Sequence, residues 1–485
     1  MDASGLIAAV VWSLAATLFG ASDGGAQAGG EPVRAAPAGL SGPRELWTLL
    51  GVDESHFEHL SDGVPWQESE DEILLRMMYR MREFRPQEME AWAHDAFPED
   101  LAEKSPRDEL DALRGEVFRL RGRVVLVEAI RLPAEFTQRY EMGEYYRAEF
   151  LLEDGRTAVV FARLVPRRWQ RNEPLEERAV APGFFLKLAG DGQGVPVFAT
   201  QRIAWYPDTL LGNLGMDVGL LDDLQPAGEQ PARRLGQMRL TLRNREAFYQ
   251  MLAAVGRAEP DALFRQAEEE LRRSGAERFS VVPLFNSPGS QHGRLVMLSG
   301  TAREVVPVHV PDEDVRARFG IDHYYQVGLF PDDSQGNPLV FCVREIPEGM
   351  PTGKGPQFGQ YVTVAGFFFN TWAYRSQAPA EGDSGAEWQL APLLIGRTVV
   401  WHPRQPPARN PATSAVAAAA FVLVLAVIWL ALWRYSRRDR DFRRKTLAKH
   451  LGGEPDAPLS ELGIEASSGP DFSQLEQPGD NRGRT

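Results

Sequence analysis

The same series of short motifs occurs twice in this chain and in the same order, which is the strongest constraint on its fold. Tyr145-Tyr146 returns as Tyr324-Tyr325, and Gly183-Phe184-Phe185 returns as Gly366-Phe367-Phe368. Other matched segments are 121–125 with 292–296, 159–161 with 339–341, 205–207 with 401–403, and, ahead of them, 78–79 with 248–249. Repetition in one order indicates that a whole structural unit has been duplicated.

Each copy begins with a helical pattern and continues with an alternating one. Residues 72–84 place apolar side chains at helical spacing, and residues 87–96 follow as a shorter helix. After residue 120 the apolar residues recur at every second position, which is typical of half-buried strands. In the first copy the predicted strands are 121–132, 144–154, 157–166, 183–190 and 196–207.

The order of these elements resembles the oligonucleotide/oligosaccharide-binding (OB) fold. Each copy has a strand after a glycine, a hairpin, a variable loop, a Val-x-Val-x-Gly-Phe-type strand (361–367 in the second copy) and a closing strand. The resemblance covers residues 121–207 and 292–403 and implies a small five-stranded Greek-key barrel in each copy. An SH3-like barrel or a small sandwich is the alternative. We therefore predict an α+β chain of two duplicated units, each a short helical segment followed by an OB-like barrel.

The resemblance also implies where ligands would bind, namely on the second and third strands and the flanking loops. The residues it selects are Tyr145, Tyr146 and Arg163 in the first copy and Tyr324, Tyr325 and Arg344 in the second, with Trp372 near the end of the fourth strand of the second copy. The alternative interpretation is that these aromatic residues fill a barrel core, as aromatic residues that alternate along strands commonly do. A fold alone does not assign a function.

An arginine-rich loop follows the third predicted strand of the first copy. Arg163, Arg167, Arg168 and Arg171 surround Trp169. Guanidinium groups pair well with phosphates and carboxylates, so this loop could hold a phosphate, a lipid headgroup or an acidic partner. The alternative is a solvated loop whose charge is balanced by the nearby glutamates 173, 176 and 177.

The sequence contains no recognisable catalytic or metal-binding constellation. No G-x-S-x-G, H-E-x-x-H or P-loop motif occurs, and the single cysteine, Cys342, excludes an internal disulfide or a cysteine-based metal site. The nearest cluster is His309, Asp312, Asp314 and His323, which we interpret as charged loop surface. We therefore predict no catalytic residue, no metal and no cofactor.

A run of twenty-two uncharged residues, Ala412–Trp433, lies near the end of the chain. At 1.5 Å per residue, a helix of about this length matches the ~30 Å hydrocarbon core of a bilayer. The segment that follows carries eight basic residues, at 434, 437, 438, 440, 443, 444, 445 and 449. Because positive charge beside a membrane span marks the cytoplasmic side, we predict a single-pass membrane protein with its N-terminal part outside the cytoplasm.

The remaining boundaries follow from composition. Residues 1–28 read as a signal peptide, with an apolar stretch and a small-residue cleavage site at Ala26-Gln27-Ala28. Retention of that stretch as an anchor is the alternative. The predicted order is a spacer (29–44), helical segment one (45–119), barrel one (120–208), a linker (209–236), helical segment two (237–290), barrel two (291–404), a stalk (405–411), the span (412–433) and a basic, disordered tail (434–485).

Charge and location together favour two classes of function. The formal net charge is −14 at pH 7, and because the tail is nearly neutral this negative charge lies before it, which argues against nucleic acid as a partner. The first hypothesis is a non-enzymatic, membrane-anchored binding or scaffold protein of the bacterial cell envelope that binds proteins or glycans through its barrels. The alternative is an envelope hydrolase with an acidic site between the two copies. The oligomeric state is open.

Overall fold

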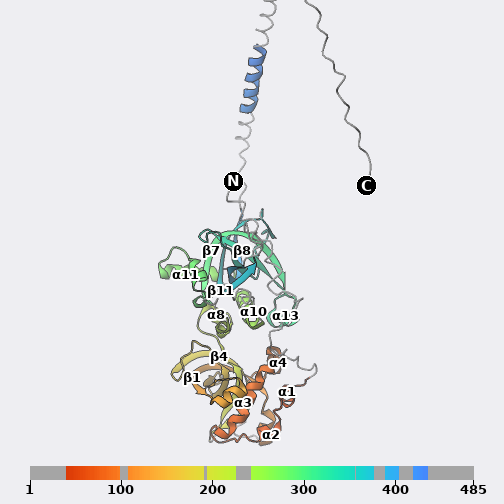
Figure 1. Ribbon diagram of the computed structural model, residues 1–485, viewed down its shortest axis with the longest axis vertical. Helices are drawn as coiled ribbons and strands as arrows, with labels where there is room; N and C mark the ends of the chain where they lie inside the picture. The colour runs from red at the N-terminus through yellow and green to blue at the C-terminus, as the bar shows by residue number, and fades with distance from the viewer. Residues whose placement is uncertain are drawn as a thin grey trace, which may run out of the picture. The chain divides into compact units, whose positions relative to one another are not determined.

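The computed structural model describes residues 40–98, 107–190, 194–224, 242–355, 357–375, 388–403 and 419–434. The chain forms two compact units, Met1–Arg404 and Gln405–Thr485. The first unit contains two six-stranded sheets, each with helices that precede it in the chain (Figure 1), so the prediction of an α+β chain is confirmed. The predicted signal peptide, residues 225–236 of the linker, the stalk and the tail beyond residue 434 lie outside the described residues.

The helical segment of the first copy packs through α3. Its side chains Leu74, Met77 and Met78 are fully buried and share one face, so the methionines fill a core. The segment consists of α1 (Pro43–Leu49), α2 (Glu54–Phe57), η3 (Glu68–Glu70), α3 (Asp71–Arg80), η4 (Met81–Glu83), α4 (Pro86–Trp92) and α6 (Arg107–Leu113).

The first sheet is a closed five-stranded barrel with a short sixth strand at its edge. Its order is β1-β2-β3-β5-β4-β6, and pairing of β1 with β4 closes the ring. Strands β3 and β5 are parallel and the other pairs are antiparallel. The strands are β1 (Val117–Arg131), β2 (Glu144–Leu152), β3 (Thr157–Leu164), β4 (Pro174–Ala189), β5 (Val195–Arg202) and β6 (Ala204–Trp205), with helix α7 (Ala134–Tyr140) between β1 and β2.

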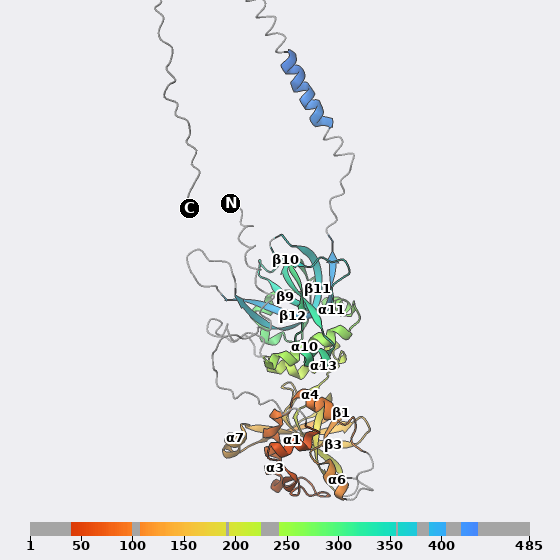
Figure 2. The same cartoon turned by 90° about the vertical axis from the view of Figure 1, so that its right-hand side faces the viewer.

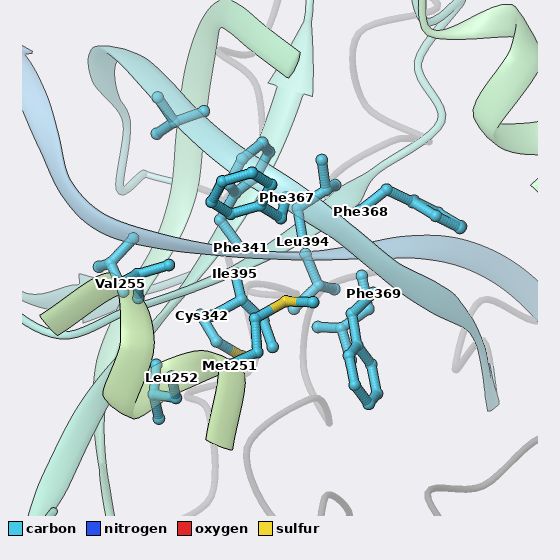
Figure 3. Close-up of a cluster of buried hydrophobic side chains, with 14 of the residues drawn as sticks. Met251, Leu252, Val255, Phe341, Cys342, Phe367, Phe368, Phe369, Leu394 and Ile395 are labelled. Carbon is cyan, nitrogen blue, oxygen red and sulfur yellow. The ribbon is translucent and has the colours of Figure 1, made fainter. Parts of the chain in front are cut away.

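The connection to the second copy begins with α8 (Leu210–Asn213) and η5 (Val218–Asp223). The second copy then opens with α10 (Leu242–Arg257), α11 (Ala262–Ser274), α12 (Val282–Asn286) and η7 (Pro288–Ser290). Helix α10 packs on β12, and Figure 3 shows its side chains Met251, Leu252 and Val255 beside Cys342 and Ile395 of the sheet. This cysteine is fully buried, and burial raises the pKa of its thiol.

The second sheet has the order β10-β7-β11-β12-β9-β8, with a further pairing of β7 with β8. Figure 2 labels β9, β10, β11 and β12 of this sheet. It is a six-stranded sheet rather than a clear barrel, because β9 is only five residues long whereas β11 and β12 extend beyond it as a two-stranded ribbon. The elements are β7 (Leu295–His309), α13 (Glu313–Phe319), β8 (His323–Pro331), β9 (Leu339–Val343), β10 (Gly353–Lys354), β11 (Gln360–Arg375) and β12 (Trp388–His402).

Strand pairing shows which residues of the two copies are equivalent. Val117 pairs with Phe184 and Leu295 pairs with Phe367, so the two Gly-Phe-Phe motifs are equivalent, as predicted. Trp205 and Trp401 also occupy matching positions, opposite Ala179 and Val362. Tyr145 and Tyr324 match as well, opposite residues 130 and 308 of the first strands.

The predicted match of Gly122 with Gly293 is wrong. Gly293 precedes β7 and is equivalent to Gly115, since both have a positive φ and bond to the Gly-Phe-Phe strand. Gly122 is equivalent to Gly300, because each lies where a Cβ atom would meet a neighbouring main-chain oxygen, 2.1 Å and 2.4 Å away. Both glycines permit this close approach of two strands. The predicted match of 159–161 with 339–341 is also displaced by one residue, since Val160 pairs with Phe198 where Phe341 pairs with Leu394.

Two features of the barrel units differ from the prediction. Strand β4 begins at Pro174 and not at residue 183, because its charged first half pairs with β1 at the surface and lacks the apolar alternation. Helices α7 and α13 lie between the first two strands of each copy, where no helix was predicted. Each has only seven residues, which is too short for a clear helical period.

The last described helix covers residues 419–434, and residues 412–418 of the predicted span lie outside the described residues. Large apolar side chains project into solvent along this helix, among them Phe421, Leu423 and Trp429, which are 65%, 66% and 66% exposed. Within the described part of the chain, no helix combines the length and apolar character needed to cross a membrane.

Candidate functional site

Two of the tyrosines selected by the resemblance lie in the protein core. Tyr145 is 3% exposed and packs at 6.1 Å from the ring of Phe161, and Tyr324 is fully buried at 5.7 Å from the ring of Phe248. Burial raises the pKa of both hydroxyl groups. Tyr145 thus belongs to the core that α3 shares with the first barrel, and Tyr324 packs on Phe248 of α10, as the core-filling interpretation expects.

The tyrosines that follow them are half-buried. The Tyr146 hydroxyl donates a hydrogen bond to Glu144 (2.6 Å), and the guanidinium of Arg171 lies 5.0 Å from its ring centre. Tyr325 meets His323 edge-on at 5.6 Å. Trp372 of β11 is 2% exposed. The structure thus places the selected aromatic residues on separate parts of the two sheets and does not form one platform from them.

Arg163 and Arg344 have the same structural role in the two copies. The Arg163 guanidinium donates to the carbonyl of Glu141, which ends α7, and to that of Met78 in α3, at 3.1 Å and 3.5 Å. Arg344 donates to the carbonyls of Gly320, which ends α13, and His323, at 3.2 Å and 3.3 Å. Burial lowers the pKa of both arginines. Each guanidinium therefore binds the inter-strand helix to the third strand.

Arg344→Gln is expected to lower the free energy of unfolding by about 1–2 kcal/mol, because it removes charge-assisted hydrogen bonds to two carbonyls. Hydrogen exchange should quicken in α13 and leave α7 unchanged. Arg163→Gln is the matched variant and should have the opposite pattern. Unaltered exchange in α13 for Arg344→Gln would show that the hydrogen bonds of Arg344 to Gly320 and His323 do not stabilise this helix.

The acidic residues around α13 are also structural. Asp312 accepts hydrogen bonds from the main-chain N–H groups of Asp314 and Val315 and thereby caps α13, and it pairs with Arg245. Asp314 lies 3.7 Å from Arg318 in the same helix. Among the described residues, no group of three or more His, Cys, Asp or Glu side chains is arranged to hold a metal ion.

A pocket of about 210 Å³ lies where the two copies meet, and we take it as the candidate site. The loop after β3 contributes Arg167 and Arg168 to its lining, and the start of the second copy contributes Gly289 and His292. The connection between the copies supplies the rest: Val218, Leu221, Asp222 and Leu224.

The four arginines of this loop differ in what they contact. Arg163 donates to the carbonyls of Met78 and Glu141. Arg171 donates to the carbonyls of Trp169 and Pro166. Arg167 and Arg168 are exposed, and no hydrogen bond or ion pair engages their guanidinium groups within the described part of the chain. Trp169 is buried, 4% exposed, so it belongs to the core and not to the pocket. Two cations are thus left facing the pocket.

Main-chain contacts position the charged groups. The N–H of Arg167 donates to the Asp222 carboxylate at 2.7 Å, which ties the loop to η5. Gly293, beside the pocket, has the positive φ of a left-handed turn, and a Cβ atom there would lie 2.9 Å from Leu221. These contacts bring together residues that lie more than fifty positions apart in the sequence.

His292 is the titratable group of the pocket. Its ring stacks on Phe368 at 5.9 Å, and its Nε2 is buried without a hydrogen-bond partner among the described residues. Burial lowers the pKa of His292; Asn370, through a hydrogen bond, and Asp222 counteract this, while Arg168 adds to it. The imidazole is therefore neutral at pH 7, and its buried Nε2 has no hydrogen-bond partner among the described residues.

The loop composition indicates Arg167 and Arg168 as binding residues, but sequence reasoning missed Asp222 and His292. No pattern in the sequence links these two residues to the loop, because only the tertiary fold brings them there. The lining contains one carboxylate, that of Asp222, and so does not offer the pair of carboxylates that the hydrolase interpretation requires.

Fold and pocket together define an α+β protein with a closed five-stranded barrel, a second six-stranded sheet and an arginine-lined pocket at their junction. No protein-family model matches the chain, and no curated protein shows significant similarity to it.

Proposed function

We propose that this protein is a non-enzymatic, membrane-anchored binding or scaffold protein of the bacterial cell envelope that holds a protein or glycan partner. The observation that carries this proposal is the junction pocket, in which both copies contribute polar groups that have no partner in the described part of the chain: Arg167, Arg168 and Nε2 of His292. Unpaired polar groups gathered in one concave place favour binding of a ligand.

We further propose that both sheets belong to the OB type. The closed ring of the first barrel, with β3 parallel to β5, supports this for the first copy. The second sheet repeats the same neighbours, strand for strand, with β9 parallel to β12. In both copies, however, the first tyrosine that the resemblance selects is buried, Tyr145 in a core shared with α3 and Tyr324 against Phe248 of α10. The binding role therefore falls to the junction pocket.

The proposed anchor is Ala412–Trp433. Its described part, 419–434, is a helix with apolar side chains exposed on all sides, which favours a lipid environment over water. The eight basic residues after it favour a cytoplasmic tail, which would place both barrels outside the cytoplasm.

Removal of residues 405–485 is expected to release the protein from the membrane completely. The full chain should remain in the membrane fraction after washing at high salt or high pH, since apolar burial does not depend on salt. A chain that lacks only 451–485 is the control and should stay in the membrane. If the 405–485 deletion also stayed there, the anchor would have to lie elsewhere in the chain.

The binding function is tested by purifying the full chain in mild detergent, after chemical cross-linking in cells, beside the double variant Arg167→Gln, Arg168→Gln. We expect a protein or glycan partner at fixed stoichiometry with the wild type and its loss with the variant. A partner retained equally by the variant, or none with either chain, would contradict a binding role for this pocket.

A further inference from the structure

We propose that the junction pocket recognises a carboxylate on a short apolar stem, such as the C-terminal end of a partner chain. This inference deepens the proposed function and rests on it.

The charge of the lining fits a single negative charge. Arg167 and Arg168 contribute two positive charges and Asp222 one negative charge, and His292 is neutral at pH 7. The balance is one positive charge. A carboxylate carries one negative charge, whereas a phosphate monoester carries about −1.5 to −2 at pH 7. The planar guanidinium fork also matches a carboxylate with two parallel hydrogen bonds.

The walls and the size define the rest of the ligand. Val218, Leu221 and Leu224 supply apolar surface beside the charged groups. The volume, about 210 Å³, lies below the roughly 300–1,000 Å³ typical of sites that enclose a whole small molecule. The pocket can therefore enclose an anionic head and a short apolar segment while the remainder of the ligand stays outside.

His292 adds a dependence on pH. A carboxylate bound in the pocket would lie beside His292 and favour the protonated imidazole, so the pKa of His292 should rise from its lowered value when the ligand binds. Binding should then take up a proton and tighten as the pH falls from about 7.5 to 5.5. The charged or polar groups that face the ring are Arg168, Asp222 and Asn370, which come from the β3 loop, η5 and β11 respectively.

The test is calorimetric titration of the full chain in detergent. The probes are a tripeptide ending in leucine with a free carboxylate, the same peptide with an amidated end, hexanoate, and inorganic phosphate. We expect the free acid and hexanoate to bind and the amide to fail. Arg168→Gln should weaken binding by about tenfold to a hundredfold. Arg265→Gln, on α11 away from the pocket, should leave it unchanged.

His292→Gln should abolish proton uptake and the tightening at low pH while retaining binding at pH 7.5. Equal affinity for the acid and the amide, or preference for phosphate, would overturn the proposal. Peptide binding without hexanoate binding would assign the site to a peptide end; the reverse would assign it to a small organic acid. A partner that needs Arg167 and Arg168 but is not displaced by the free acid would sink this inference alone and leave the proposed function standing.

Discussion

Lys187→Met is expected to lower the free energy of unfolding of the first barrel by about 3–5 kcal/mol, because it leaves a carboxylate buried without its cation. The ammonium of Lys187 lies 2.7 Å from each carboxylate oxygen of Glu70, and the two side chains are 0% and 1% exposed. The ammonium also donates to the carbonyl of Pro65 at 3.3 Å. The Glu70 carboxylate accepts from the N–H groups of Ser61 and Gln67, both at 2.9 Å.

This network binds the turn before α3 to the barrel, since Glu70 ends η3 and Lys187 lies in β4. Its loss should therefore loosen both. Hydrogen exchange, read on peptides of β4 and of β11, measures the effect. Of these two strands, only β4 should lose protection. The position equivalent to Lys187 in the second copy is Asn370, which follows the same bulge after the Gly-Phe-Phe motif and so carries no ion pair of this kind.

The control is the double variant Glu70→Gln, Lys187→Met. It removes both charges, and replacing a buried ion pair by uncharged side chains costs far less than breaking it. The double variant should recover most of the stability that the single variant loses. A double variant as unstable as Lys187→Met would show that packing of the lysine stem, and not the ion pair, is what matters.

The fold was predictable where apolar residues follow a period. The alternation along β2 and β3 and the Gly-Phe-Phe motif report burial directly, so these strands and their repetition could be found from the sequence. The register of the first strand could not be found from the sequence. Gly122 and Gly293 stand in similar local sequences, yet one lies within a strand contact and the other in a turn before the strand. Only the position of the neighbouring strand distinguishes them.

The sequence does not predict which polar residues are buried. Lys187, Glu70, Glu304 and Gln326 are all fully buried, although a pattern of polar residues predicts surface. The residues of the candidate site likewise fall into those that the sequence indicates and those that it does not. Local composition indicated the arginines of the β3 loop, whereas His292 reaches them only through the tertiary fold.

Glu304→Gln is expected to stabilise the second sheet by about 3 kcal/mol at pH 8 and to have little effect at pH 4.5. Glu304 lies on β7, fully buried, and neither carboxylate oxygen has a hydrogen-bond partner among the described residues. A Cβ atom added to Gly328, on the neighbouring strand, would lie 3.7 Å from Oε2 of Glu304. Burial raises the pKa of Glu304 to about 7, and the charge of Lys354 on β10 opposes this only in part.

The sign follows from proton binding. An unfolded glutamate titrates near its ordinary pKa of 4.5, so between that value and about 7 the folded chain holds a proton that the unfolded chain has lost. The stability is therefore fully present below pH 4.5 and falls as the pH rises towards 7. The difference between a pKa of about 7 in the folded chain and 4.5 in the unfolded chain corresponds to about 3 kcal/mol. The amide of glutamine does not ionise and so removes this dependence.

Urea unfolding between pH 4.5 and 8, followed by hydrogen exchange in β7 and β8, measures the effect. Glu128→Gln is the matched variant, because Glu128 lies on β1, the corresponding strand of the first copy, half-buried and paired with Arg147 at 2.8 Å. It should not stabilise the protein at pH 8. If wild type and Glu304→Gln lost stability in parallel from pH 4.5 to 8, the buried carboxylate could not be the group that titrates.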